Sequence, residues 1–92
     1  MKITVRAFAR FREVVGDLNV VDLPEGSGIP ALLAALSSRT DESRMLLFDE
    51  QGRIRDHIIF MVNRKRVART ALPAFGLADG DEVAIYPPVA GG

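Results

Sequence analysis

One segment of the chain has the hydrophobic period of a main helix, and segments with the period of strands lie on both sides of it. In residues 29–39, IPALLAALSSR, apolar side chains recur at helical spacing. These positions are Ile29, Leu32, Leu33 and Leu36. Pro30 is compatible with the helix because the amides of a first turn have no partner within the helix. Such a helix buries its apolar stripe most simply across one face of a sheet, so the sequence predicts an α+β domain.

Two strands are predicted before this helix. Residues 2–8, KITVRAF, alternate as a half-buried strand does. One side carries Ile3, Val5 and Ala7, and the other carries Thr4, Arg6 and Phe8. Gly16-Asp17 is a turn signal, and residues 18–23, LNVVDL, are expected to return antiparallel to the first strand. Residues 9–16, ARFREVVG, are interpreted as a long connection between these strands.

After the helix, the pattern predicts a second short helix and three strands. Residues 41–50, DESRMLLFDE, form the short helix, with Asp41 as its N-cap. Residues 57–63, HIIFMVN, are typical of a strand that is apolar on both faces, and NRKRVA then turns into a short strand.

The last predicted strand follows a tight Asp79-Gly80 turn. Val83 and Ile85 face one way, and Ala84 and Tyr86 face the other. The strand stops at Pro87, which has no amide to donate to the sheet.

The summed order is two strands, the main helix, a short helix, two strands, a loop and a last strand. This order matches the β-grasp, or ubiquitin-like, arrangement: a mixed sheet of four to five strands with one main helix packed across it. We expect one β-grasp domain in residues 1–88 and a flexible reactive tail in residues 89–92, because 92 residues suffice for a single core.

Composition excludes several classes of function. The chain has no cysteine, which rules out disulfides and thiolate metal sites and favours a reducing cytosol. Lysine plus arginine balance aspartate plus glutamate, so no overall field attracts nucleic acid or an anionic membrane. Without a signal-peptide pattern or a membrane-spanning run, we expect a cytoplasmic, soluble protein that is a monomer when free.

Several segments together resemble one known family. These are FARFRE after the first strand, LPEG before the main helix, LFDEQGRIR before the third strand and the closing ADGDEVAIYPPVAGG. Along almost the whole chain they resemble the MoaD/ThiS family of ubiquitin-like sulfur carriers. The Pro-Pro of the closing stretch is more similar to MoaD, the small subunit of molybdopterin synthase, and to the small archaeal modifier proteins than to the shorter ThiS.

The resemblance implies that the C-terminal carboxyl of Gly92 is the reacting group. A ubiquitin-activating-type (MoeB-like) enzyme would adenylate it with ATP, a sulfur donor would convert it to a thiocarboxylate, and a MoaE-like large subunit would use the sulfur to build molybdopterin. The chain itself would bind no cofactor and catalyse nothing. There are three alternatives. The chain could be a modifier that is attached through Gly92 to lysines of target proteins, a carrier for tRNA thiolation or for cysteine or thiamine synthesis, or an adaptor that never reacts.

The tail has physical properties that suit this role. Pro87 and Pro88 hold the exit from the domain extended. Residues 89–92, Val89-Ala90-Gly91-Gly92, reach about 13 Å when extended, enough to enter a narrow channel. The two glycines keep the end of the tail slim and conformationally free. The alternative is an ordinary frayed terminus.

Phe8 and Tyr86 are candidate partner-binding residues. By alternation, both point outward from their strands, so the two rings are expected to share one exposed face of the sheet. In MoaD-like proteins the matching positions help to dock the carrier; a third position of that patch is usually apolar but is Arg66 here. Alternatively, Phe8 closes the edge of the core and Tyr86 packs under the tail.

Other candidate sites are better explained by structure. His57 is the only histidine and is expected at the edge of the third strand. The segment EGSG lacks the lysine and spacing of a phosphate-binding loop and is interpreted as a helix entry. The carboxylates of Asp79, Asp81 and Glu82 are assigned to turn chemistry rather than to a metal. The basic run NRKRVAR is interpreted as a solvated hairpin, with nucleic-acid binding or docking to an acidic surface as alternatives.

Overall fold

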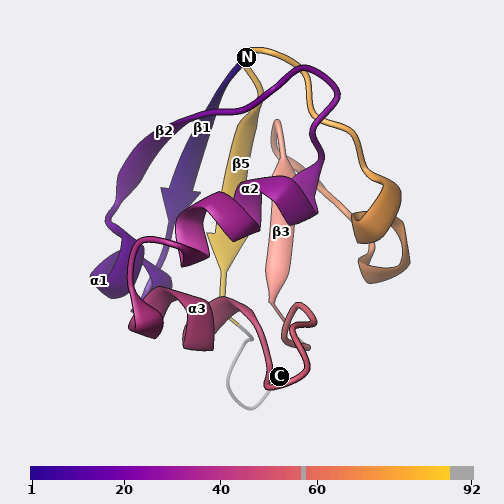
Figure 1. The fold of residues 1–92 in the computed structure, drawn as a ribbon. Helices are drawn as coiled ribbons and strands as arrows, with labels where there is room; N and C mark the ends of the chain where they lie inside the picture. Colours follow the sequence, from indigo (N-terminus) through magenta and orange to yellow (C-terminus); the bar gives the residue numbers. More distant parts are fainter. Residues whose placement is uncertain (57, 88–92) are drawn as a thin grey trace.

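The computed structural model describes residues 1–56 and 58–87, and these build a five-stranded mixed sheet. The strands are β1 (Lys2–Ala7), β2 (Leu18–Asp22), β3 (Ile59–Val62), β4 (Lys65–Arg66) and β5 (Glu82–Tyr86). Their order across the sheet is β2-β1-β5-β3-β4. β5 runs parallel to β1 and antiparallel to β3, while the β1–β2 and β3–β4 pairs are antiparallel (Figure 1). The predicted β-grasp arrangement is confirmed.

The helices lie on one side of this sheet. α2 (Ile29–Ser37) crosses the sheet, and α3 (Asp41–Leu47) lies alongside α2 (Figure 1). A short helix, α1 (Arg10–Val15), connects β1 to β2, and a 3-10 helix, η1 (Arg69–Ala74), stands between β4 and β5. The opposite face of the sheet carries no helix among the described residues.

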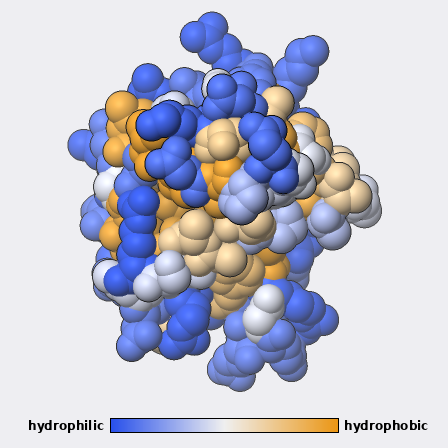
Figure 2. Space-filling view, turned by 45° about the horizontal axis from the view of Figure 1, so that its top comes forward, coloured by the Kyte–Doolittle hydropathy of each residue, from blue (hydrophilic) through white to orange (hydrophobic). Residues whose placement is uncertain are grey.

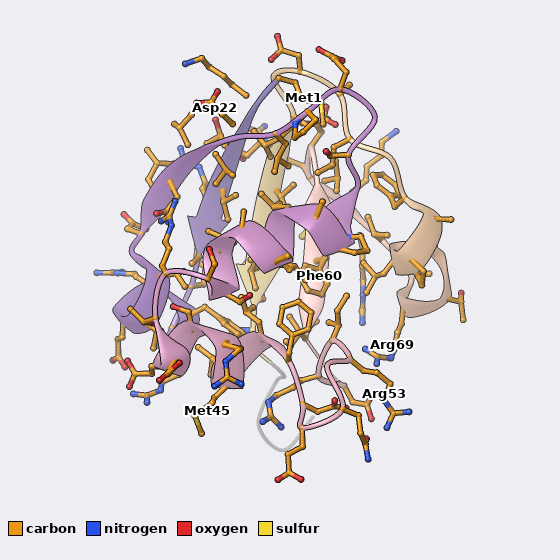
Figure 3. The ribbon with its side chains drawn as sticks, in the orientation of Figure 1. Met1, Asp22, Met45, Arg53, Phe60 and Arg69 are labelled. Carbon is orange, nitrogen blue, oxygen red and sulfur yellow. The ribbon has the colours of Figure 1, made fainter. Side chains whose placement is uncertain are left out.

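The core forms between α2 and the inner face of the sheet. The four apolar residues predicted on the main helix are all fully buried. They pack with the inward positions of the strands, Ile3, Val5, Ala7, Val83 and Ile85, so the predicted alternation of β1 and β5 is confirmed. Phe60 of β3, 1% exposed, lies below α2 (Figure 3). On its outer side, α2 exposes Ala31 and Ala34. In the face seen in Figure 2, hydrophobic surface lies in the middle and hydrophilic side chains border it.

Gly28 marks the entry of α2, where two segments of backbone come close together. It pairs with Gly76 in an isolated β-bridge, and the next amide, of Ile29, donates to the carbonyl of Phe75 at 3.3 Å. A Cβ on Gly28 would lie 2.6 Å from that carbonyl oxygen, whereas a Cβ on Gly76 would meet nothing within 4 Å. The EGSG segment is thus a helix entry, as predicted, and its last glycine is needed for a close contact.

Three local predictions need correction or completion. The connection 9–16 contains helix α1, whose Phe11 and Val15 are buried in the core. The N-cap of α3 is Thr40 rather than Asp41: its hydroxyl oxygen accepts a hydrogen bond from the amide of Ser43 at 3.0 Å. Asp41 is already inside the first turn, where its charge faces the positive end of the helix. η1 was not predicted.

Within the described ranges, 1–56 and 58–87, no helix has both the length and the apolar character needed to cross a membrane.

Candidate functional site

The site begins where the central strand β5 ends. β5 lies between β1 and β3 and stops at Tyr86, as predicted, and Pro87 is the last residue described. Each neighbouring strand pairs with four β5 residues, so this strand is held from both sides. The predicted tail residues Pro88, Val89, Ala90, Gly91 and Gly92 lie outside the described residues, and their roles stay predictions. His57 also lies outside them.

Phe8 and Tyr86 stack on each other at this end of the sheet. Their ring centroids are 4.3 Å apart and their planes differ by 7°. The amide of Phe8 donates to the carbonyl of Ile85 at 3.1 Å, which places the backbone of Phe8 beside β5. Both rings are half-buried, and neither belongs to the core cluster between α2 and the sheet. The structure thus brings the two predicted residues together on one surface, and their docking role stays a prediction.

An open hollow of about 560 Å³ surrounds the stacked rings. It is mainly apolar and is lined by Phe8, Ala9, Ile59, Met61, Arg66, Tyr86 and Pro87. Ile59 and Met61 alternate with the buried Phe60 and Val62 along β3, so they face outward. The sequence already contained this signal, because a strand that is apolar on both faces must place some apolar side chains on the outer face. We call these seven residues the apolar hollow.

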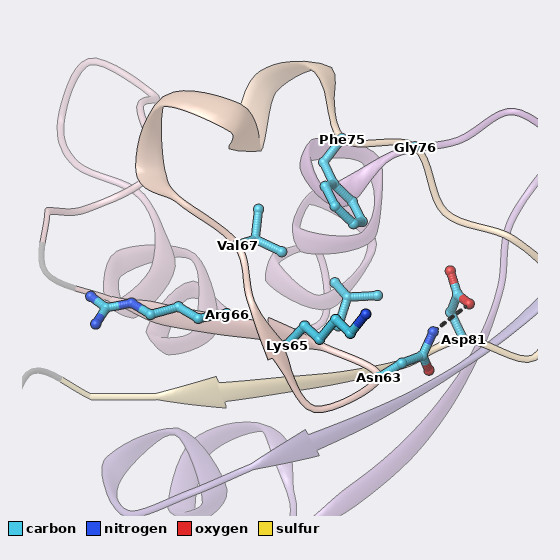
Figure 4. Close-up of a pocket in the computed structure, with 8 residues that line it drawn as sticks. Asn63, Lys65, Arg66, Val67, Phe75, Gly76 and Asp81 are labelled. Atoms are coloured by element: carbon cyan, nitrogen blue, oxygen red, sulfur yellow. Dashed lines mark hydrogen bonds between the residues drawn. The ribbon is translucent and has the colours of Figure 1, made fainter.

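Of the described residues that line the apolar hollow, Arg66 alone carries a charged side chain. It lies opposite Met61 in the register between β3 and β4. The neighbouring Lys65 lies opposite Val62 on the inner side, and in the close-up of the β3–β4 hairpin the two side chains extend in opposite directions (Figure 4). Strand β4 therefore separates its two basic residues onto different faces.

The basic run around Arg66 is a solvent-exposed hairpin, as predicted. Its two turn residues, Asn63 and Arg64, have φ values of 50° and 70°, which suits the two-residue turns that join antiparallel strands. The amide of the Asn63 side chain donates to Asp81 at 2.9 Å (Figure 4). This contact ties the hairpin turn to the loop before β5.

Of the three acidic residues around the start of β5, Asp81 makes the predicted contact within the turn, whereas Asp79 and Glu82 contact residues of β1. Asp79 accepts from the amide of Lys2 at 2.7 Å, Asp81 accepts from the amide of Ala78 at 2.8 Å, and Glu82 forms an ion pair with Arg6 at 3.3 Å. Among residues 1–56 and 58–87, no group of three or more histidine, aspartate or glutamate side chains is placed to hold a metal ion.

A further carboxylate, that of the half-buried Asp49, organises the turn after α3. It accepts hydrogen bonds from the amides of Arg53 and Gln51 at 3.0 and 2.9 Å. The hydrogen bond from the Arg53 amide is the main reason why the pKa of Asp49 lies below its ordinary value. Asp49 does not line the apolar hollow, and its contacts are local.

Comparison with known proteins agrees with this geometry. The model of the ThiS family matches residues 5–92. Small archaeal modifier protein 3 of Haloferax volcanii is 33% identical over 93 residues, an alignment that covers 100% of both chains. The molybdopterin synthase sulfur carrier subunit of Aedes aegypti is also 33% identical, over 100% of this chain and 90% of that protein. The crystal structure of SAMP1 from Haloferax volcanii superposes with a TM-score of 0.85 at 30% identity, over 100% of both chains.

Fold and site together define a small ubiquitin-like protein with an apolar surface beside the end of its central strand. The chain belongs to the ThiS family, a family of ubiquitin-like sulfur carriers and modifiers, and the resemblance seen in the sequence is confirmed.

Proposed function

We propose that this protein is a sulfur carrier whose reacting atom is the carboxyl carbon of Gly92. The observation that supports the proposal best is the position of the chain exit. β5 is fixed between two strands and delivers Pro87 to the edge of the apolar hollow, and the chain continues from there as Pro-Val-Ala-Gly-Gly. A partner that covers the hollow is in the right place to receive the last glycine.

The proposed chemistry needs two steps, both in a partner enzyme. A carboxylate is a poor electrophile, so the enzyme first joins it to the α-phosphate of ATP, which yields an acyl-adenylate and releases pyrophosphate. A hydrosulfide equivalent from a sulfur donor then attacks the acyl carbon. The carbon–sulfur bond forms, AMP leaves with the bridging oxygen, and the thiol proton goes to solvent, which gives the thiocarboxylate. ATP is bound by the enzyme, and this chain acts as co-substrate rather than catalyst.

For the use of the sulfur, we propose molybdopterin synthesis with a MoaE-like large subunit as the partner. The relative from Aedes aegypti supports this choice, because its name describes it as the sulfur carrier subunit of molybdopterin synthase. The equally similar relative from Haloferax volcanii is named a modifier, which favours a second candidate: conjugation of Gly92 to lysines of target proteins. Both candidates share the adenylation step. We place the protein in the cytoplasm, as a free monomer that binds neither nucleic acid nor membrane.

Mass spectrometry tests the carrier proposal directly. The purified chain is incubated with the ubiquitin-activating-type enzyme of the same organism, magnesium, ATP and sulfide, and is then digested with trypsin. Cleavage after Arg69 releases residues 70–92 as one peptide that contains no methionine. Replacement of one oxygen by one sulfur in this peptide therefore cannot be confused with methionine oxidation, which produces a nearly equal gain in mass.

The control is a chain that lacks Gly92. We expect it to remain unmodified while its free energy of unfolding stays within about 0.5 kcal/mol of the wild type. If pyrophosphate exchange shows that the wild-type chain is adenylated and yet its C-terminal peptide gains no sulfur, the carrier proposal is wrong.

A further inference from the structure

A row of side chains crosses the outer face of the sheet and carries an arginine on each side of the central strands. The strand registers place Arg6, Ala84, Met61 and Arg66 in this row, from β1 through β5 and β3 to β4. The two arginines are therefore in similar positions on the sheet. Their electrostatic surroundings can be compared directly.

The two arginines differ in their partners. The guanidinium of Arg6 lies 3.3 Å from the carboxylate of Glu82 and is neutralised within the chain. Four further arginines also have carboxylate partners within 4 Å, namely Arg10, Arg44, Arg53 and Arg69. Within residues 1–56 and 58–87, Arg66 has no such partner, and it is the residue that lines the apolar hollow. Among the part of the chain that the structure describes, this positive charge therefore has no counter-ion at the edge of an apolar surface.

Covering this surface has an energetic consequence. A partner that packs against the stacked rings and Met61 also removes water from the neighbouring guanidinium. Removing water from an unpaired charge is costly, whereas a carboxylate placed opposite it forms a charge-assisted hydrogen bond. A purely apolar partner surface leaves this penalty uncompensated, whereas a carboxylate offsets it through the charge-assisted hydrogen bond.

We propose that Arg66 makes the apolar hollow selective for a partner surface on which a carboxylate stands beside an apolar side chain, and that this partner is the adenylating enzyme. The inference rests on the proposed function. The adenylating enzyme is the occupant because adenylation is the step that both candidate functions share, and because Pro87 both lines the hollow and leads to the terminal glycine. The protein that takes the terminal glycine into its site must therefore lie against the hollow and meet Arg66.

A simpler role for Arg66 must be separated from this one. β4 is an edge strand, and charged residues on edge strands prevent other chains from adding to the sheet. Glutamate at position 66 would preserve an edge charge but reverse its sign. Arg66→Glu therefore retains the protective role and abolishes the proposed one, whereas Arg66→Leu removes both and makes the hollow entirely apolar.

The test measures pyrophosphate exchange by the adenylating enzyme as the concentration of carrier is varied. For Arg66→Glu we expect KM for the carrier to rise about tenfold or more with little change in kcat, because a like charge then opposes the enzyme's carboxylate. For Arg66→Leu we expect a rise of about threefold or more. Arg64→Glu is the matched control: it reverses another exposed arginine of the hairpin that does not line the hollow, and its KM should change less than about twofold.

Four outcomes would overturn the inference. An unchanged or lower KM for Arg66→Leu would show that the enzyme binds the hollow through apolar contacts alone. Equal increases in KM for Arg64→Glu and Arg66→Glu would show that the enzyme responds to the total charge of the hairpin rather than to Arg66. A wild-type dimer that Arg66→Glu separates, seen by size-exclusion chromatography, would identify a second copy as the occupant. Absence of exchange with the wild type would instead defeat the proposed function and this inference with it. Rescue of Arg66→Glu by an enzyme variant with one acid changed to arginine supports the proposal.

Discussion

The stacked rings of Phe8 and Tyr86 allow a docking role to be separated from a structural one. Replacing Tyr86 by alanine removes a half-buried ring and its stacking contact. Stacking contributes about 0.5–1.5 kcal/mol, and full burial of an aromatic side chain contributes about 1.5–3 kcal/mol, of which a half-buried ring gains a part. We therefore expect Tyr86→Ala to lower the free energy of unfolding by about 1–2 kcal/mol.

Phe60 provides the matched control, because it is an aromatic residue of the adjacent strand that is 1% exposed. Phe60→Ala should cost about 3–5 kcal/mol, as expected for a ring removed from a core. Urea denaturation measures both losses. Phe8→Ala should resemble Tyr86→Ala, and the double variant should cost less than the sum of the two single variants because the stacking contact is lost only once.

The same variants are then tested for partner binding. Tyr86→Ala and Phe8→Ala should each weaken binding to the adenylating enzyme or to the synthase subunit by about 1–3 kcal/mol, as central aromatic anchors commonly do. Isothermal titration calorimetry measures this change while the variants remain folded. A stability loss of about 3 kcal/mol or more, or an unchanged affinity for both partners, would refute a docking role and assign the rings to structure.

Three further predictions concern the helix entries and the choice between carrier and modifier. Gly28→Ala should lower the free energy of unfolding by about 1–3 kcal/mol because its Cβ would clash with a carbonyl oxygen, whereas Gly76→Ala should lower it by less than about 1 kcal/mol. Equal losses in urea denaturation would contradict the close contact at Gly28. Thr40→Ala should lower the melting temperature through a loss of about 1 kcal/mol, and Asp41→Ala should cost less, an order that would be reversed if Asp41 were the cap. Finally, an Ala90→Arg variant is recovered from cells under denaturing conditions and digested with trypsin. We expect Gly-Gly remnants on only a minority of lysines. Abundant remnants on many unrelated proteins, lost when the last glycine is deleted, would favour the modifier.

The main elements could be predicted from the sequence because their side-chain periods are long enough to be unambiguous. β1 alternates over six residues and α2 carries four apolar positions at helical spacing. Helix α1, by contrast, has only six residues, and Phe11 and Val15 are its only buried side chains. A helix of this length is unstable alone, so packing against the rest of the fold decides whether it forms.

The N-cap of α3 illustrates a different limit. Thr40 and Asp41 are adjacent and both are good capping residues, so the pattern alone does not choose between them. The choice depends on which residue has extended backbone angles, and Thr40 has them, with φ −148° and ψ 158°.

The candidate site was predicted in part. The proximity of Phe8 and Tyr86 followed from strand alternation, because both rings point outward near the ends of their strands. Ile59 and Met61 were not identified as members of the same surface, since the strand they belong to is apolar on both faces and its outward side could be assigned only once β3 was placed next to β5.

The central position of β5 also has a mechanical consequence. A partner that draws the terminal residues into a channel pulls on Pro87 along the direction of the strand. The hydrogen bonds that join β5 to β1 and to β3 run across this direction, so the load is shared by four residue pairs on each side and must shear both ladders at once. A strand at the edge of the sheet would resist with one ladder only. The domain is therefore built to stay folded while its end is under tension.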